Sequence, residues 1–451
     1  MRTTFMTCFV FTLVLGCGGK KNGADDDDTG PDACVGLECQ VVDCASMSMP
    51  PTTITGTVFA PNGTLPLNGV NVYVPRDPLP PFTEGVSCDR CSSTLPGSPI
   101  TQTVSGADGT FRLENVPAGA DIPLVVTTGK WRREVTISNV TQCSDNSTTQ
   151  DQTRLPRNKS EGDIPKIAIA TGNADSMECL PRKLGIDDSE ITNSSGTGRI
   201  HLYAGNGVND FDNGFAGGPG PISSATPFWS SVDSLSQYDI VILSCEGTQN
   251  PNTKPQAALD AMKAYADKGG RVFASHWHNI WIGGNFDDNN PNLAPAVWPT
   301  VGMNWGNQGN FSSGTDVIDT VNNPKGGLFS DWMQTVGASP NTPGEFPVTQ
   351  FRVTVDGVDT TKAEQWVFTK GDGGAPANKP QMFQFTTPLE VANDQRCGKV
   401  VFTDMHVSGS RRQGDYPTSC VPNATDLDLT PQEKALAFMF FDISSCVGGL
   451  F

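Results

Sequence analysis

Hydrophobic residues follow two different patterns in the two halves of this 451-residue chain. Between residues 52 and 140 they alternate with polar residues in short runs separated by turn signals, as at residues 54–59 and 69–74. Alternation places the apolar side chains on one face of a strand, and short strands at regular spacing are typical of a β-sandwich. From residue 164 the apolar runs become continuous, as at residues 164–172, which is typical of strands buried on both faces.

The second half alternates such strands with helices. Three further apolar runs share the pattern, at residues 238–244, 271–275 and 400–403. Residues 255–268 predict a helix, because a proline suits its first turn and a glycine follows its end. A capping box at residues 430–433 opens a second helix. The alternation predicts a doubly wound, flavodoxin-like α/β domain over residues 164–451, with residues 310–395 as a β-rich insertion or an antiparallel extension.

Residues 1–16 predict an export signal. A positive residue at position 2 precedes an apolar stretch that is too short for a membrane-spanning helix. The stretch ends in a Gly-Cys pair at Cys17, which resembles a bacterial lipobox. The resemblance implies that Cys17 is lipidated, and Gly18 lacks the usual inner-membrane retention signal, so we expect a lipoprotein at the outer membrane or cell surface. The alternative is an ordinary secretory signal with an accidental cysteine.

Three segments lie between the signal and the α/β domain. Residues 17–47 predict a cysteine-rich tether with a run of four aspartates, and residues 144–163 are so poor in apolar residues that they predict a linker. Residues 48–143 contain the predicted sandwich. Its ITGTVFAPNG opening, GVNVYVP strand and SGADGTFRLENVPAG block resemble the carboxypeptidase-regulatory-like, transthyretin-like family. This resemblance implies a spacer or binding module without catalytic residues.

Composition narrows the function. The chain has 30 basic and 48 acidic residues, a net charge of −18, which excludes a general nucleic-acid binder. Thirteen cysteines indicate an oxidising compartment with disulfides, and the eleven left after the signal and Cys17 imply at least one free thiol. Cysteine clusters at 34, 39 and 44 and at 88 and 91 are compatible with zinc, but export favours disulfides. We expect Cys179 and Cys245 to pair, because each follows a predicted strand.

Three of the four histidines follow predicted parallel strands, where open α/β sheets place their ligand crevice. The GGRVFASHWH segment at residues 269–278 resembles the nucleophile turn of class I glutamine amidotransferase-like folds, with His276 in place of the cysteine. The ThuA-like family shares that substitution, and residues 398–406 resemble its closing segment. The resemblance implies a role connected with carbohydrates and gives His276 and His406 as the candidate catalytic pair.

Four neighbours complete the candidate site. Asp404 and Glu246 are further catalytic candidates, with Cys245 as a possible neighbour, and Trp277 and His278 are candidate ligand-binding residues, since aromatic side chains stack on sugars. Converging histidines can transfer protons near neutral pH or bind a transition metal. The side chains of His276 and His278 point to the same side only on an extended segment and not on a helix, so we predict no set of metal ligands. Alternatively, the imidazoles only satisfy backbone groups at strand ends.

The leading hypothesis is an outer-membrane-anchored lipoprotein that binds or processes an extracellular carbohydrate or a related small molecule. The second is a non-catalytic surface or adhesion protein with an inactive amidotransferase-like domain. A metal-dependent hydrolase that uses the histidines is the third. No cofactor follows from the sequence.

Overall fold

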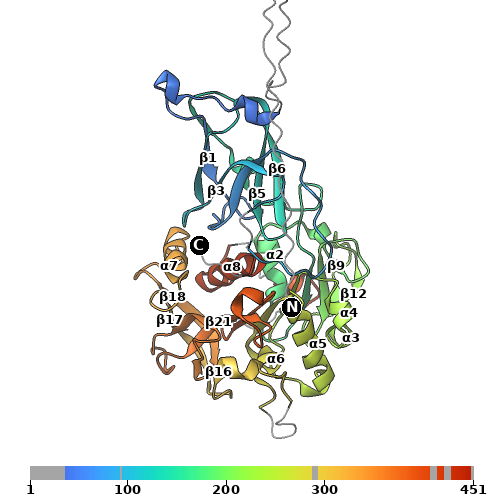
Figure 1. The fold of residues 1–451 in the computed structure, drawn as a ribbon. Coiled ribbons are helices and arrows are strands. Elements are labelled where there is room, and N and C mark those ends of the chain that lie inside the picture. The colour runs from blue at the N-terminus through green and yellow to red at the C-terminus, as the bar shows by residue number, and fades with distance from the viewer. Residues whose placement is uncertain (1–35, 92–93, 287–292, 407–413, 421–427, 448–451) are drawn as a thin grey trace, which may run out of the picture. The chain divides into compact units, whose positions relative to one another are not determined.

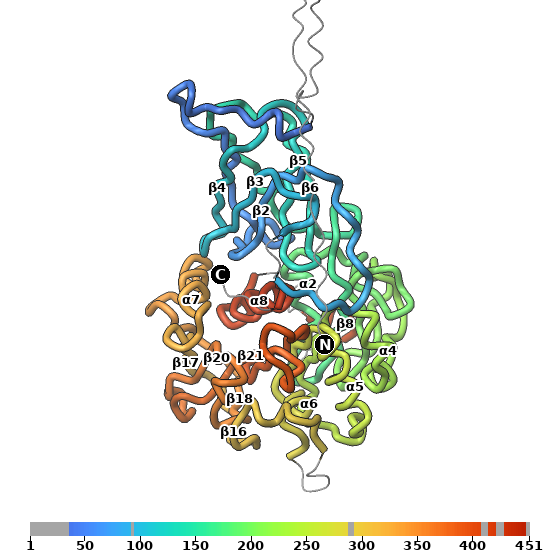
Figure 2. The backbone as a smooth tube through the Cα atoms, viewed as in Figure 1, coloured from blue at the N-terminus to red at the C-terminus, as the bar shows by residue number. Residues whose placement is uncertain are grey.

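The computed structural model describes residues 36–91, 94–286, 293–406, 414–420 and 428–447 (Figures 1 and 2). The first layer is a sandwich of two small sheets. One sheet has the order β4 (Thr110–Glu114), β1 (Thr53–Thr57), β7 (Asp145–Ser147), and the other β3 (Pro99–Val104), β2 (Asn71–Pro75), β5 (Gly119–Thr128), β6 (Trp131–Val140). The alternation of apolar and polar residues explains why the two sheets pack together, since strands such as β4 bury every second residue between the sheets.

A third and larger sheet contains the remaining long strands. Its parallel part has the order β13 (Ser223–Ser224), β10 (Ile200–Ala204), β8 (Ile167–Ala170), β14 (Ile240–Leu243), β15 (Arg271–Ser275), β22 (Gly398–Thr403), and β9 (Ile191–Asn193) also pairs with β10. The antiparallel part continues through β21 (Pro380–Thr387), β20 (Glu364–Thr369), β17 (Gly309–Ile318) and β18 (Glu345–Val353). The five long parallel strands, numbered along the chain, therefore run 2-1-3-4-5, and residues 309–387 extend the same sheet.

Two small ribbons and the helices make up the other regular elements of the described residues. Two small ribbons pair β11 (Asp210–Phe211) with β12 (Gly220–Pro221) and β16 (Gly302–Met303) with β19 (Gly357–Val358). The α-helices are α1 (Gln150–Thr153), α2 (Leu180–Lys183), α3 (Ala225–Trp229), α4 (Val232–Leu235), α5 (Gln256–Asp267), α6 (Ile280–Gly283), α7 (Gly326–Thr335) and α8 (Pro431–Ser444). The 3-10 helices are η1 (Leu37–Gln40), η2 (Ala45–Met47), η3 (Met177–Cys179), η4 (Asp188–Glu190), η5 (Pro251–Thr253), η6 (His276–Asn279), η7 (Trp298–Val301), η8 (Asn393–Gln395) and η9 (Thr418–Cys420).

Both faces of the parallel sheet are buried. In β8, Ile167 and Ile169 belong to the core that contains α8, whereas Ala168 and Ala170 belong to the core that contains α5. Successive strand residues point to opposite faces, so a strand covered by helices on both sides must be apolar throughout. This explains the continuous apolar runs in the second half of the chain.

The sandwich and the α/β region share one hydrophobic core. Trp131 on β6 is fully buried against Phe440 and Phe441 of α8, with ring centroids 6.1 and 5.8 Å away. Its indole Nε1 donates a hydrogen bond to Ser444 Oγ at 3.3 Å. Helix α8 therefore packs on the sandwich with one side and on the large sheet with another (Figure 1).

The segment predicted as a linker, residues 144–163, is packed against the fold. It contains β7 and α1, and Leu155 is completely buried. Arg154 is buried as well and forms ion pairs with Asp151 and Glu161. Ion pairs, together with the burial of Leu155, therefore hold this polar segment in place.

Four disulfides join distant parts of the described chain: Cys44–Cys143, Cys88–Cys397, Cys91–Cys446 and Cys179–Cys420. Two of them fasten the segment between β2 and β3 to the α/β region. The predicted Cys179–Cys245 bridge is wrong, because Cys179 pairs with Cys420 and Cys245 is a free, buried thiol. Disulfides persist in oxidising compartments, so this set indicates an exported protein.

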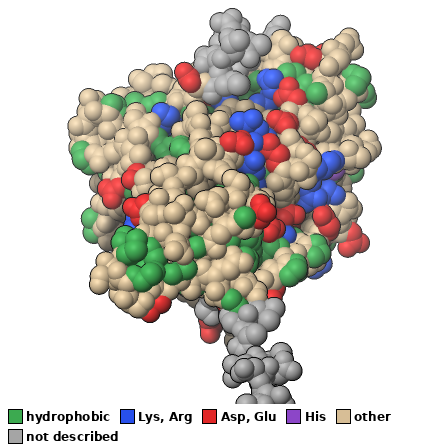
Figure 3. All heavy atoms as spheres, turned by 90° about the horizontal axis from the view of Figure 1, so that it is seen from above, with side chains coloured by type: hydrophobic (Ala, Val, Ile, Leu, Met, Phe, Trp, Pro, Cys, Tyr) green, Lys and Arg blue, Asp and Glu red, His purple; other side chains and the backbone are tan. Residues whose placement is uncertain are grey.

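Charged side chains of both signs are mixed on the face seen in Figure 3. Basic side chains lie there next to acidic ones rather than forming one continuous basic surface. Within the described ranges, no helix combines the length and the apolar character needed to cross a membrane. The predicted lipidation site, Cys17, lies outside the described residues.

Candidate functional site

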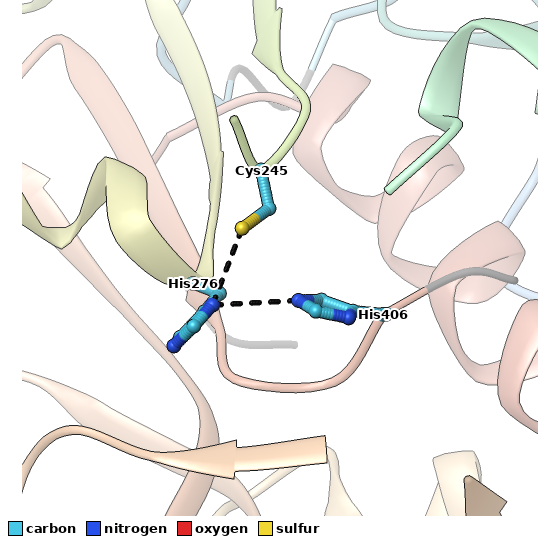
Figure 4. A group of neighbouring side chains, drawn as sticks. All are labelled: Cys245, His276 and His406. Carbon is cyan, nitrogen blue, oxygen red and sulfur yellow. Dashed lines mark hydrogen bonds between the residues drawn. The ribbon is translucent and has the colours of Figure 1, made fainter. Parts of the chain in front are cut away.

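Three chemically reactive side chains meet at the carboxyl ends of three adjacent parallel strands. Cys245 follows β14, His276 follows β15 directly, and His406 follows β22. Because β14, β15 and β22 are neighbours in the sheet, their ends lie side by side. Figure 4 shows the side chains of Cys245 and His406 directed at one ring nitrogen of His276. Open α/β sheets place their ligand crevices at this edge.

The distances within this cluster are short. Cys245 Sγ lies 3.2 Å from His276 Nδ1, and His406 Nε2 lies 3.4 Å from the same nitrogen. One ligand atom from each of the three residues lies within 4.8 Å of the other two. All three side chains are at most 1% exposed. We call Cys245, His276 and His406 the Cys-His-His cluster.

A strained backbone holds the central member of the cluster. His276 has a φ of +40°, which side-chain-bearing residues rarely adopt and which costs on the order of 1–3 kcal/mol. The strand β15 ends at Ser275, and η6 begins at the next residue, His276. This turn sets the rings of His276 and half-buried Trp277 4.6 Å apart between centroids. The fold thus maintains an unfavourable conformation at the residue that the sequence singled out.

Burial keeps the cluster uncharged. It raises the pKa of the Cys245 thiol to about 12, although hydrogen bonds from the backbone of Trp277 and Gly247 act in the opposite direction. Burial also lowers the pKa of His406 to about 3 and that of His276 well below its ordinary value, and the positive charge of Arg352 adds to both effects. A thiol with a high pKa beside a weakly basic imidazole does not form the thiolate–imidazolium pair of a cysteine nucleophile.

Asp404 lies next to the cluster but is bound elsewhere. Its carboxylate accepts hydrogen bonds from Thr354 N at 2.8 Å and from Thr354 Oγ1 at 2.9 Å. Burial raises the pKa of this carboxyl to about 7, against the effect of those hydrogen bonds and of Arg352. The residue predicted as catalytic therefore fastens the loop after β18 to the end of β22.

Glu246, the other predicted carboxylate, forms a buried ion pair with Lys254. Its second contact is Asn250 Nδ2, which donates a hydrogen bond at 3.1 Å. Burial raises the pKa of Glu246, but the electrostatic effects of His278 and Lys254, together with hydrogen bonds from Lys254 and Asn250, outweigh it, so the net pKa lies below its ordinary value. Glu246 thus closes the loop between β14 and α5.

His278 does not join the cluster, because η6 contains both His276 and His278, and residues two apart on a helix point to different sides. Its Nε2 lies 2.8 Å from the Ser244 carbonyl, and Trp281 Nε1 donates to its Nδ1 at 2.8 Å. Both ring nitrogens are therefore occupied, and the side chain is 1% exposed. Of the two predicted ligand-binding residues, only Trp277 retains exposed surface.

Two residues of the site were not predicted as members. Cys245 was named only as a possible neighbour and was assigned to a disulfide, although its position after an apolar strand points to the sheet edge. Arg352 lies on β18, where its backbone N donates to the Asp404 carbonyl at 3.0 Å. The side chain is half-buried, donates from Nη1 to the Phe351 carbonyl, and its charge acts on all three cluster residues. Nothing in the local sequence marks it, because the antiparallel extension brings it to this edge.

The fourth histidine provides a test of pH dependence away from the cluster. His201 lies on β10, with Nδ1 2.7 Å from Tyr238 Oη and Nε2 3.1 Å from the Gly198 carbonyl. Burial, with help from the charge of Lys166, lowers its pKa to about 4. An unfolded histidine titrates near pH 6.5, so the unfolded chain binds more protons between pH 6.5 and 4, and stability falls as the pH drops through that window.

We expect this residue to account for a loss of about 3 kcal/mol in the free energy of unfolding between pH 7 and pH 4. Urea unfolding of the wild type and of a His201→Gln variant at both pH values measures it. The variant should lose less stability than the wild type on acidification. Equal losses in the two proteins would contradict the assignment.

Comparisons with known proteins identify no family for this chain. No protein-family model matches it, and no curated protein matches it. Among solved structures, a type II cohesin–X-dockerin complex from Acetivibrio cellulolyticus is 17% identical over 30% of this chain and 85% of that one, with a TM-score of 0.17. The GH42 β-galactosidase Gan42B is 9% identical over 64% of this chain and 31% of that one, with a TM-score of 0.28. The exo-β-1,4-mannosidase Op5Man5 from Opitutaceae bacterium strain TAV5 is 10% identical over 54% and 32%, with a TM-score of 0.24. Several of these neighbours are carbohydrate-related proteins, but the similarity is too low to assign a fold or a ligand to this chain.

Proposed function

We propose that this chain is an outer-membrane lipoprotein, anchored through Cys17, whose C-terminal region binds or processes a carbohydrate or a related small molecule at the Cys-His-His cluster. The region is a doubly wound, ThuA-like α/β domain in this proposal. The strand order 2-1-3-4-5 and the cores on both sheet faces support that class. The four disulfides support export.

The observation that carries the proposal is a difference between two pairs of histidines. In His201 and His278, both ring nitrogens have hydrogen-bond partners. In His276 and His406, one nitrogen faces the cluster, and the other, Nε2 and Nδ1 respectively, is buried and has no partner among the described residues. Buried polar atoms are nearly always bonded, so a histidine with only a structural role resembles the first pair. The second pair is arranged for a ligand.

Two partly exposed side chains next to the cluster suit a sugar-like ligand. Trp277 offers an aromatic face beside His276, and Arg352 offers guanidinium N–H groups beside His406. Aromatic rings pack against the apolar faces of sugars, and guanidinium groups bind hydroxyl and carboxylate oxygens in pairs. The ligand that fits is a polyhydroxylated molecule, and the arginine favours one with an acidic group.

A screen of neutral and acidic saccharides by thermal unfolding tests this function. A ligand present at 100 times its Kd stabilises the folded chain by about 2.7 kcal/mol. We expect at least one saccharide to do so with the wild type and with Lys370→Ala, and not with Arg352→Ala. Lys370 is the matched control, since it is a partly exposed cation that pairs with Glu345 outside the cluster. If no saccharide stabilises the wild type, the protein is better described as a non-catalytic surface protein.

A further inference from the structure

We propose that Cys245, His276 and His406 bind one transition-metal ion of the zinc class and leave a coordination position open toward the ligand. The inference deepens the function proposed above, because it uses the same cluster, but it does not depend on which ligand binds there. It rests on the donor types, their spacing and the protons they carry.

The donor types match a borderline-soft metal ion. Cys245 offers a thiolate and the two histidines offer neutral imidazoles, which are the ligands that zinc and copper prefer. Calcium and magnesium require oxygen ligands, and none of the three donor atoms is an oxygen. Three protein ligands with a fourth position open is the pattern of catalytic zinc sites, whereas structural sites have four.

The spacing fits coordination to one ion. With zinc–nitrogen bonds of 2.0–2.1 Å and a zinc–sulfur bond of 2.3 Å, tetrahedral geometry places two nitrogens about 3.3 Å apart and a nitrogen and a sulfur about 3.6 Å apart. The nitrogens of His276 and His406 are 3.4 Å apart, and the sulfur of Cys245 is 3.2 Å from His276. The remaining separation is at most 4.8 Å.

Proton counting shows that hydrogen bonds alone cannot satisfy the cluster. Nδ1 of His276 faces both Cys245 Sγ and His406 Nε2. A ring nitrogen carries one proton or one lone pair, so at most one of these two contacts is a full hydrogen bond. A metal ion accepts a lone pair from all three groups at once. The protons of the two imidazoles then lie on Nε2 of His276 and Nδ1 of His406, the two atoms without partners.

The surroundings also favour a cation. Asp175 is completely buried, accepts a hydrogen bond from Ser275 Oγ at 2.6 Å, and its charge acts on the sulfur of Cys245. The backbone N–H groups that reach this sulfur, from Trp277 and Gly247, stabilise a thiolate. Arg352 is a positive charge that acts on the same sulfur, and Asp404 is a further carboxyl group whose charge acts on Arg352. Metal coordination deprotonates a thiol outright.

Metal analysis of the full exported chain tests the inference. The chain is equilibrated with Zn²⁺, freed of excess ion and analysed by mass spectrometry for metals. We expect one equivalent in the wild type and a more than about 100-fold weaker affinity in Cys245→Ser, His276→Gln and His406→Gln, since loss of a mere outer-shell contact costs 10–100-fold. His201→Gln is the control that should keep the metal. Loading with Co²⁺ should produce a thiolate-to-cobalt charge-transfer band that Cys245→Ser lacks.

The outcomes separate this inference from the proposed function. No stoichiometric metal in the folded wild type, or equal metal in the three cluster variants, overturns the metal site. Circular dichroism and the disulfide count establish that each variant is folded. If the folded wild type takes up no stoichiometric metal but binds a saccharide, the function stands and the metal site falls. If the chain binds metal but no saccharide, the metal site stands and the function falls.

Discussion

Replacing Cys179 and Cys420 together by alanine should lower the free energy of unfolding by about 5 kcal/mol. Their disulfide closes a loop of 241 residues, and the loss of conformational freedom that a crosslink imposes on the unfolded chain grows with loop length. The bridge also fastens η9 to η3, near fully buried Tyr416. Chemical denaturation of the double variant measures the loss.

The matched control is Cys245→Ser, which removes a thiol of similar burial without opening a crosslink. It should cost well under half as much stability as the double variant. Peptide mapping without reduction should recover Cys179 joined to Cys420, and Cys245 should react with a thiol reagent only after unfolding. A Cys179–Cys245 peptide, or equal losses in the two proteins, would reject the pairing.

Much of the fold could be predicted because the local patterns were strong. The helix at 255–268 appears as α5, and the capping box opens α8 at Thr430 with both reciprocal hydrogen bonds. The strand at 271–275 has the predicted bounds. Strand β10 was not predicted, because its five residues include a histidine and a tyrosine and so do not form a continuous apolar run.

The packing of the sandwich on the α/β region was not predictable from local pattern. Trp131 is an example, since nothing in its local sequence indicates that it is buried against α8. The residues that cover it lie more than 300 positions away in the chain. Likewise, ion pairs such as those of Arg154 hold the polar segment 144–163 in place, and such ion pairs cannot be predicted from composition.

The candidate site shows the same limit. His276 and His406 were brought together as predicted, since each follows a parallel strand and the two strands are neighbours. Cys245 was misassigned because disulfide partners depend on where loops run, and Cys420 lies in a loop region without a strand pattern. The position of Arg352 beside the cluster depends on the register of the antiparallel strands, which could not be predicted from the sequence.

Replacing Lys254 by methionine should lower the free energy of unfolding by about 3–5 kcal/mol. The ammonium group is completely buried, pairs with Glu246, donates to the Gln249 carbonyl at 3.1 Å and lies 4.9 Å from the centre of the Trp229 ring. Methionine fills a similar volume, so packing changes little. The variant buries the Glu246 carboxylate without its counter-charge, and this unpaired buried charge destabilises the folded state.

A double-mutant cycle with Glu246→Gln separates this charge effect from a role in the site. The double variant Lys254→Met/Glu246→Gln buries no charge, so it should recover most of the stability that Lys254→Met loses. Because Glu246 is bound to Lys254 and Asn250 rather than to the cluster, the double variant should also retain metal and saccharide binding. Chemical denaturation and the two binding assays decide the matter. If the double variant is stable but binds neither ligand, Glu246 belongs to the functional machinery, as its sequence position first indicated. If Lys254→Met is as stable as the wild type, the ion pair has no role in holding the loop that carries Cys245 to the edge of the sheet.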